Sequence, residues 1–197
     1  MLRIILAAAA MISSGAIASA DGHGEGGHSA MAIEAGNPAP EIVAVTAAGQ
    51  VVNLDGISGE KGAVLVFSRS LDWCPYCKAQ ALELETVKAD LGAAGWTMNL
   101  ITYDSPDLLA EFSTEKDLTY TFLSDTGSAT IDAFGLRNED VTEGSRFDGI
   151  PHPAIVYIKA NGDIAGIQKE AGYKERPATA GIPEMVAQIN QDGLSAE

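Results

Sequence analysis

The only two cysteines of the chain, Cys74 and Cys77, are spaced C-x-x-C between two stretches of contrasting pattern. The apolar run at residues 63–67 just before them predicts a buried strand. From residue 79 to residue 91, apolar side chains recur at roughly helical spacing, which predicts a helix over residues 74–93. A chain with this pattern must hold both sulfur atoms at one junction between a strand and a helix.

This junction predicts a chemical role for each cysteine. Pro75 fits the first turn of the helix, where a proline loses no hydrogen bond. The unpaired N–H groups and the dipole at this end favour an anion, so we expect Cys74 to be an exposed nucleophile with a stabilised thiolate. Cys77 lies one turn deeper on the same face, so we expect it to be buried and to resolve a disulfide made by Cys74.

Three other interpretations of the cysteine pair compete with redox activity. A structural disulfide over this spacing would close a very small loop and restrain the unfolded chain little. A closed zinc site needs four ligands, and the chain has no second C-x-x-C. Two buried and inert cysteines are a third interpretation, but burial does not account for the spacing. A C-x-x-C beside a βαβ pattern is typical of a thioredoxin-like redox site.

The first 36 residues predict export followed by a flexible segment. Residues 1–20 have a positive start, a short apolar core and the small-residue end Ala18-Ser-Ala20, which together predict a signal peptide. We therefore expect an exported, periplasmic protein with no stable membrane anchor after cleavage. Residues 21–36 are rich in Gly and His and predict a flexible tail. Its two histidines, His23 and His28, indicate either weak metal binding or a solvated linker.

Charge and length limit the classes of partner. The chain has 27 acidic and 12 basic residues, a formal net charge of −15, which excludes nucleic acid as a favourable partner. Residues 37–197 are long enough for one domain with a sizeable core. We expect no cofactor and no resident metal, a redox partner protein, and protein or small-molecule disulfides or dithiols as substrates.

Strand and helix patterns alternate along this domain. We expect an N-terminal hairpin, a central sheet, flanking helices, and an exposed loop at residues 138–149. The expected strands are 41–46, 50–54, 63–67, 96–103, 119–123, 154–158 and 164–167; the expected helices are 74–93, one that begins near Ser105, 126–134 and 184–191. This order predicts an α/β fold with a mixed sheet.

Several segments make the chain similar to a known family. They are residues 37–40, 72–78, 101–106, 123–125, 134–135, 149–153 and 173–177. With them the chain resembles the thioredoxin superfamily, and within it the redoxin group of alkyl hydroperoxide reductase and thiol-specific antioxidant proteins. The resemblance implies a thioredoxin-like fold. It also implies that Pro153 is a cis-proline opposite the cysteines, which would place His152 next to the thiol pair.

The chain departs from the patterns of these families at three places. Thioredoxins carry a buried acid where this chain has Ser68. Peroxiredoxins carry a threonine and a proline where Leu71 and Phe67 stand before Cys74, so we expect weak peroxidase activity. The Pro75-Tyr76 pair between the cysteines is similar to that of glutaredoxins instead.

The sequence leaves three functions open. The main interpretation is a thiol–disulfide oxidoreductase that exchanges electrons through Cys74 and Cys77. The first alternative is a peroxiredoxin-like thiol peroxidase with antioxidant activity, and the second is a copper-binding protein with His152 as a third ligand. Trp73 would either shield the site and offer a docking edge or simply pack in the core. A protonated His152 would favour the Cys74 thiolate, whereas a neutral one would only hold loop backbone.

Overall fold

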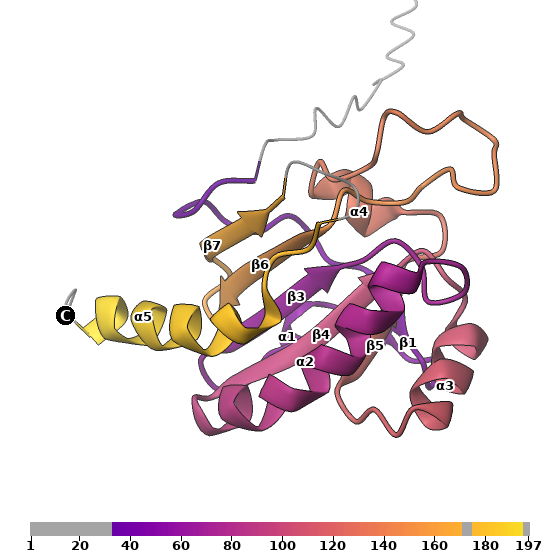
Figure 1. Ribbon diagram of the computed structural model, residues 1–197. Coiled ribbons are helices and arrows are strands. Elements are labelled where there is room, and N and C mark those ends of the chain that lie inside the picture. The colour runs from indigo at the N-terminus through magenta and orange to yellow at the C-terminus, as the bar shows by residue number, and fades with distance from the viewer. Residues whose placement is uncertain (1–32, 171–174, 195–197) are drawn as a thin grey trace, which may run out of the picture.

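A mixed β-sheet runs through the centre of the computed structural model, which describes residues 33–170 and 175–194 (Figure 1). Its seven strands lie in the order β2-β1-β5-β4-β3-β6-β7. They are β1 (Ala44–Thr46), β2 (Val51–Val52), β3 (Gly62–Phe67), β4 (Trp96–Thr102), β5 (Thr121–Ser124), β6 (Ala154–Lys159) and β7 (Ile164–Lys169). β3, β4 and β5 are parallel, while β6 is antiparallel to β3, so the sheet is mixed as expected.

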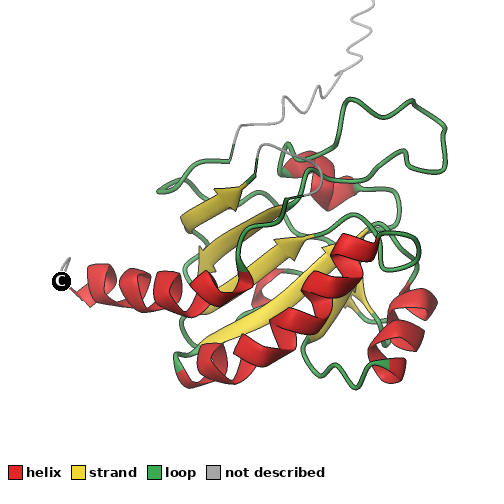
Figure 2. Cartoon of the chain, viewed as in Figure 1, coloured by secondary structure: helices red, strands yellow, loops and turns green. Residues whose placement is uncertain are grey.

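Helices cover both faces of the sheet (Figure 2). They are α1 (Leu54–Ile57), α2 (Pro75–Ala93), α3 (Pro106–Glu115), α4 (Ala129–Ala133) and α5 (Ile182–Leu194), with a 3₁₀ turn, η1 (Thr179–Gly181), before α5. One core contains side chains of α2, α3 and α5, and the other contains side chains of α1 and α4. This arrangement is the thioredoxin-like α/β fold that the sequence predicts.

The central strand β3 shows why this sequence forms a sheet covered on both faces. All six of its residues are buried. Val64 and Val66 belong to the core that contains α2, whereas Leu65 and Phe67 belong to the core that contains α4. Since successive side chains of a strand point to opposite faces, only a continuous apolar run can fill both cores. The same strand then leads directly into the segment that carries the cysteines.

Two parts of the chain differ from the expected boundaries. A strand is expected over residues 50–54, but β2 ends at Val52 and α1 begins at Leu54, capped by Asn53, whose side-chain oxygen accepts the N–H of Gly56 at 3.1 Å. Of the tail predicted for residues 21–36, only residues 33–36 are described, and there the N–H of Gly36 donates to the carbonyl of Ile164 at 2.8 Å. The predicted signal peptide and residues 21–32 lie outside the described residues.

Pro153 does not have the predicted geometry. Every peptide bond in the described part of the chain is trans, including the one between His152 and Pro153. The segment before β6 pairs with the segment that contains Leu136 and Arg137. The N–H of His152 donates to the carbonyl of Leu136 at 2.7 Å, and Pro151 forms an antiparallel bridge with Arg137. Pro153 is buried and stands directly before β6.

Within residues 33–170 and 175–194, no helix is both long enough and apolar enough to cross a bilayer.

Candidate redox site

The two cysteines form a disulfide at the N-terminus of α2, with their Cα atoms 5.2 Å apart. Cys74 is the N-cap residue, and its Sγ accepts the backbone N–H of Cys77 at 3.2 Å. Pro75 occupies the first turn, as the sequence predicts. Both cysteines are completely buried, so the expectation of an exposed Cys74 is wrong for this oxidised form.

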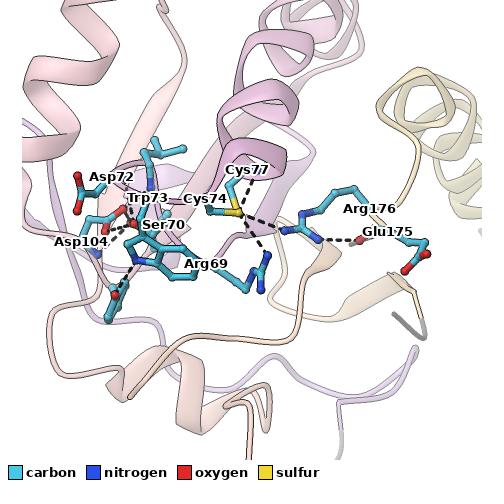
Figure 3. Close-up of a disulfide and its surroundings, with 12 residues drawn as sticks. Arg69, Ser70, Asp72, Trp73, Cys74, Cys77, Asp104, Glu175 and Arg176 are labelled. Carbon is cyan, nitrogen blue, oxygen red and sulfur yellow. Dashed lines mark hydrogen bonds between the residues drawn. A yellow bond between two sulfur atoms is a disulfide. The ribbon is translucent and has the colours of Figure 1, made fainter. Parts of the chain in front are cut away.

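Two arginines that the sequence analysis did not select contact the sulfur atoms (Figure 3). The Nη2 atom of Arg69 lies 3.5 Å from Sγ of Cys74. The Nη2 atom of Arg176 lies 3.2 Å from Sγ of Cys77 and 3.6 Å from Sγ of Cys74. Arg69 comes from the loop between β3 and α2, and Arg176 from the segment just before η1. Three N–H donors therefore converge on Sγ of Cys74.

The positive charges of the two arginines act on one another. Burial and, to a smaller extent, the charge of Arg69 lower the pKa of Arg176 to about 10, while the charge of Glu175 opposes the shift. Both guanidinium groups still carry their charge at neutral pH. Because a guanidinium stabilises a nearby anion, a thiolate formed at Cys74 would be favoured here by more than the helix end alone.

A buried carboxylate fixes the loop that carries Arg69 and Trp73. Asp104 accepts the hydroxyl of Ser70 at 2.8 Å, the N–H of Leu71 at 2.6 Å and the hydroxyl of Thr102 at 3.0 Å. Burial raises the pKa of Asp104, and these hydrogen bonds only partly offset that effect. Asp104 therefore joins the end of β4 to the loop before α2 and holds the approach to Cys74 in one conformation.

Trp73 links the site to the long loop at residues 138–149. Its indole N–H donates to the hydroxyl of Tyr103 at 3.0 Å, and that hydroxyl donates to the carbonyl of Arg146 at 2.9 Å. The Trp73 ring packs edge-on against Phe147, with ring centroids 4.7 Å apart. The guanidinium of Arg69 lies 5.4 Å from the centroid of the Trp73 ring, within the range of a cation–π contact.

The remaining predicted residues lie in different surroundings. The Nε2 atom of His152 pairs with Oε2 of Glu139 at 3.0 Å. The cations that contact the sulfurs are Arg69 and Arg176. Tyr76 is 46% exposed and lies on the solvent side of α2. Leu71 is buried, and its backbone rather than its side chain contributes polar contacts.

A thioredoxin-like sheet with a disulfide at a helix N-terminus and two adjacent cations defines a thiol-dependent oxidoreductase. Sequence comparison narrows this class, because residues 35–167 match the AhpC/TSA family. The chain belongs to the AhpC/TSA family. It is 30% identical over 132 residues to a putative peroxiredoxin bcp of Haemophilus influenzae and to peroxiredoxin Bcp of Escherichia coli, covering 67% of this chain and 83% of each relative.

Solved structures give the same fold. A peroxiredoxin-like protein from Aquifex aeolicus superposes with a TM-score of 0.69 at 22% identity, covering 81% of this chain and 89% of that one. AhpC of Mycobacterium tuberculosis superposes with the same TM-score of 0.69 at 14% identity, covering 83% of this chain and 97% of that one.

The relatives favour the first alternative function over the main interpretation from the sequence. They are peroxiredoxins, so the broad assignment as a thiol oxidoreductase holds and the peroxidase alternative gains support. These relatives give no support to copper binding. Within residues 33–170 and 175–194, no cluster of three or more His, Cys, Asp or Glu side chains could hold a metal ion. Arg176 lies outside residues 35–167, which match the family model, but inside the segment 173–177 that resembles the family, and that segment was the available signal for it.

Proposed function

We propose that this protein is a thiol peroxidase that reduces a hydroperoxide with the Cys74–Cys77 dithiol. One observation carries the proposal: Sγ of Cys74 receives N–H groups from Cys77, Arg69 and Arg176 within 3.2–3.6 Å. In the reduced protein these donors would surround a thiolate, which is the form of cysteine that attacks a peroxide. The named peroxiredoxin relatives support the same reaction.

In this mechanism the Cys74 thiolate attacks the terminal oxygen of the hydroperoxide. A sulfur–oxygen bond forms, the oxygen–oxygen bond breaks, and the alkoxide leaves and takes up a proton from solvent as an alcohol. The two guanidinium groups stabilise the negative charge as it moves from sulfur to the departing oxygen. Cys74 is then a sulfenic acid, and Cys77 attacks its sulfur, so that water leaves and the observed disulfide forms.

Leu71 stands where peroxiredoxins carry a threonine, but the site still has the N–H donors to sulfur that this reaction needs. The Leu71 side chain is buried, and its N–H is already bound to Asp104 at 2.6 Å. Arg69 and Arg176 supply N–H groups at the sulfur instead. We therefore replace the expectation of weak peroxidase activity by one of substantial activity.

A single-turnover experiment tests the proposal. Reduced protein, freed of excess reductant, is mixed with a limiting amount of hydrogen peroxide or cumene hydroperoxide. We expect two thiols to disappear for each peroxide consumed. Cys77→Ser should stop at a sulfenic acid that dimedone captures at Cys74, and Cys74→Ser should consume almost no peroxide. Unchanged consumption by Cys74→Ser would contradict the proposal.

We also propose that residues 1–20 direct export and that the reaction takes place in the periplasm. The positive start, apolar core and small-residue end of this segment support the proposal. Expression of the full chain in a Gram-negative host, followed by fractionation and mass measurement, tests it. A periplasmic product that begins at Asp21 is expected, and a cytoplasmic product that keeps residues 1–20 would contradict it.

A further inference from the structure

The two arginines of the site differ in their access to solvent. Arg69 is only 9% exposed and both cysteines are completely buried, whereas Arg176 is partly exposed. Arg176 also contacts both sulfurs, whereas Arg69 contacts the disulfide at Sγ of Cys74. Of these two arginines, Arg176 is therefore the more accessible to a molecule from solvent.

The oxidation state of the cysteines changes what Arg176 binds. In the disulfide, the Arg176 guanidinium donates to neutral sulfur, with N–S distances of 3.2 and 3.6 Å. In the reduced protein the same donors would face a thiolate, and hydrogen bonds to ionised acceptors are about twice as strong as those between neutral groups. Oxidation thus removes one negative charge from a place where two guanidinium groups remain. A carboxylate is then a better acceptor for Arg176 than the disulfide is.

We propose that Arg176, with Arg69 behind it, binds the carboxylate of a small anionic thiol that reduces the disulfide. This inference rests on the proposed function, since a peroxidase must have its disulfide reduced after every turnover. It names the chemical class of the reductant: a low-molecular-weight thiol that carries a carboxylate. When its carboxylate exchanges with sulfur as the acceptor, the guanidinium moves off the disulfide and leaves the sulfurs open to attack.

The chemistry balances with two molecules of this thiol. The first attacks Cys77 as a thiolate, a new sulfur–sulfur bond forms, the Cys74–Cys77 bond breaks, and Cys74 leaves as a thiolate beside the backbone N–H of Cys77 and the guanidinium of Arg69. The second thiolate attacks the sulfur of the bound reductant, which releases a symmetrical disulfide. Cys77 takes up a proton and becomes a thiol. Two electrons pass from the two small thiols to the protein.

The net charge of the chain and a local carboxylate site predict opposite effects of the charge of the thiol on the rate of reduction. With a formal net charge of −15, the overall field of the protein repels anions and attracts cations. That field alone predicts that a cationic thiol reduces the disulfide fastest and an anionic thiol slowest. A local carboxylate site at Arg176 predicts the opposite order.

Rapid-quench thiol labelling of the oxidised full-length protein measures the rate of disulfide reduction. The probes are 3-mercaptopropionate, 2-mercaptoethanol and cysteamine, compared at equal thiolate concentration and low ionic strength. We expect the anionic thiol to be roughly tenfold faster than the neutral one, the size expected for one added bond to a charged group. The cationic thiol should be slowest, and salt should reduce the spread.

Matched variants locate the effect. Arg176→Gln should bring the anionic-to-neutral rate ratio close to one, and Arg176→Lys should keep part of it. Lys61→Gln removes the same charge next to the opposite end of β3 and should leave the ratio unchanged.

A wild-type ratio at or below one, or the same ratio in Arg176→Gln, would overturn the inference. The thiol series on the wild-type protein decides the question even if a variant fails to fold. Because no peroxide is present here and no reductant is present in the single-turnover peroxidase assay, the two results are independent of each other.

Discussion

The guanidinium of Arg176 lies 3.2 Å from Sγ of Cys77, although 99 positions separate these residues in the chain. The fold creates this contact by bringing the segment before η1 alongside the start of α2, where the side-chain N–H of Gln80 also reaches the carbonyl of Pro177 at 3.5 Å. The redox site is therefore assembled from two distant parts of the sequence. One part supplies both sulfurs and Arg69, and the other supplies a second cation.

The first prediction concerns Arg69 and the charge on Cys74. In a Cys77→Ser background, where Cys74 is the only thiol, Arg69→Gln should move the thiolate titration of the reduced protein to higher pH by roughly one unit, since a nearby cation favours the thiolate. Ultraviolet absorbance of the thiolate against pH measures the midpoint. Arg69→Lys should recover part of the shift.

His152→Ala is the control for this measurement. His152 pairs with Glu139 at the exposed loop, so its removal should leave the Cys74 titration in place. Equal shifts in Arg69→Gln and His152→Ala would mean that the arginine has no special role. No shift in either would mean that the helix end alone sets the charge on Cys74.

The second prediction concerns Asp104 and the pH dependence of stability. Burial raises its pKa above the ordinary value of 3.8, so the folded protein holds this proton more tightly than the unfolded chain does. Its ionised form is therefore penalised at neutral pH, and the penalty disappears as pH falls through the folded pKa. The free energy of unfolding of wild type, minus that of Asp104→Asn, should increase between pH 7 and about pH 4.5. Urea unfolding at both pH values measures it, and a decrease in this difference would show that the pKa is lowered instead.

The third prediction concerns the hydroxyl of Tyr103, which accepts from Trp73 and donates to the carbonyl of Arg146. Tyr103→Phe removes both bonds but keeps the ring. Each such bond contributes about 1 kcal/mol, so amide hydrogen exchange in residues 138–149 should quicken roughly tenfold. Tyr76→Phe, on the exposed face of α2, is the matched control and should change nothing there. Equal exchange rates in wild type and Tyr103→Phe would mean that the loop is held by other contacts.

Local patterns predicted most of the fold and only half of the site. The apolar run of β3, the C-x-x-C spacing and the periodicity of α2 are properties of neighbouring residues, and the structure has all three. Arg69 stands only five residues before Cys74, and the chain has only 12 basic residues. A basic residue this close to the cysteines could therefore have been selected from the sequence. Arg176 stands in the segment 173–177 that resembles the family, but its contact with sulfurs about a hundred positions earlier is not a property of neighbouring residues.

The errors have physical causes of the same kind. α1 has four residues, too few for a period to be visible in the sequence. The cis geometry expected of Pro153 came from the family pattern and not from the residues around it. In this protein the segment before β6 is bound to the carbonyl of Leu136, and the imidazole of His152 pairs with Glu139. Neither contact could be read from residues 149–153 alone.

The rate at which hydrogen peroxide oxidises the reduced protein decides whether this chain is a thiol peroxidase. Stopped-flow mixing, with tryptophan fluorescence reporting on Trp73 beside the disulfide, gives a second-order rate constant that is compared with that of an ordinary low-pKa thiol in the same buffer. A thiol peroxidase should have a wild-type constant several orders of magnitude higher, abolished by Cys74→Ser and strongly reduced by Arg69→Gln. A wild-type constant no higher than that of the ordinary thiol would contradict this assignment, and would return the protein to the class of thiol–disulfide oxidoreductases without peroxidase activity.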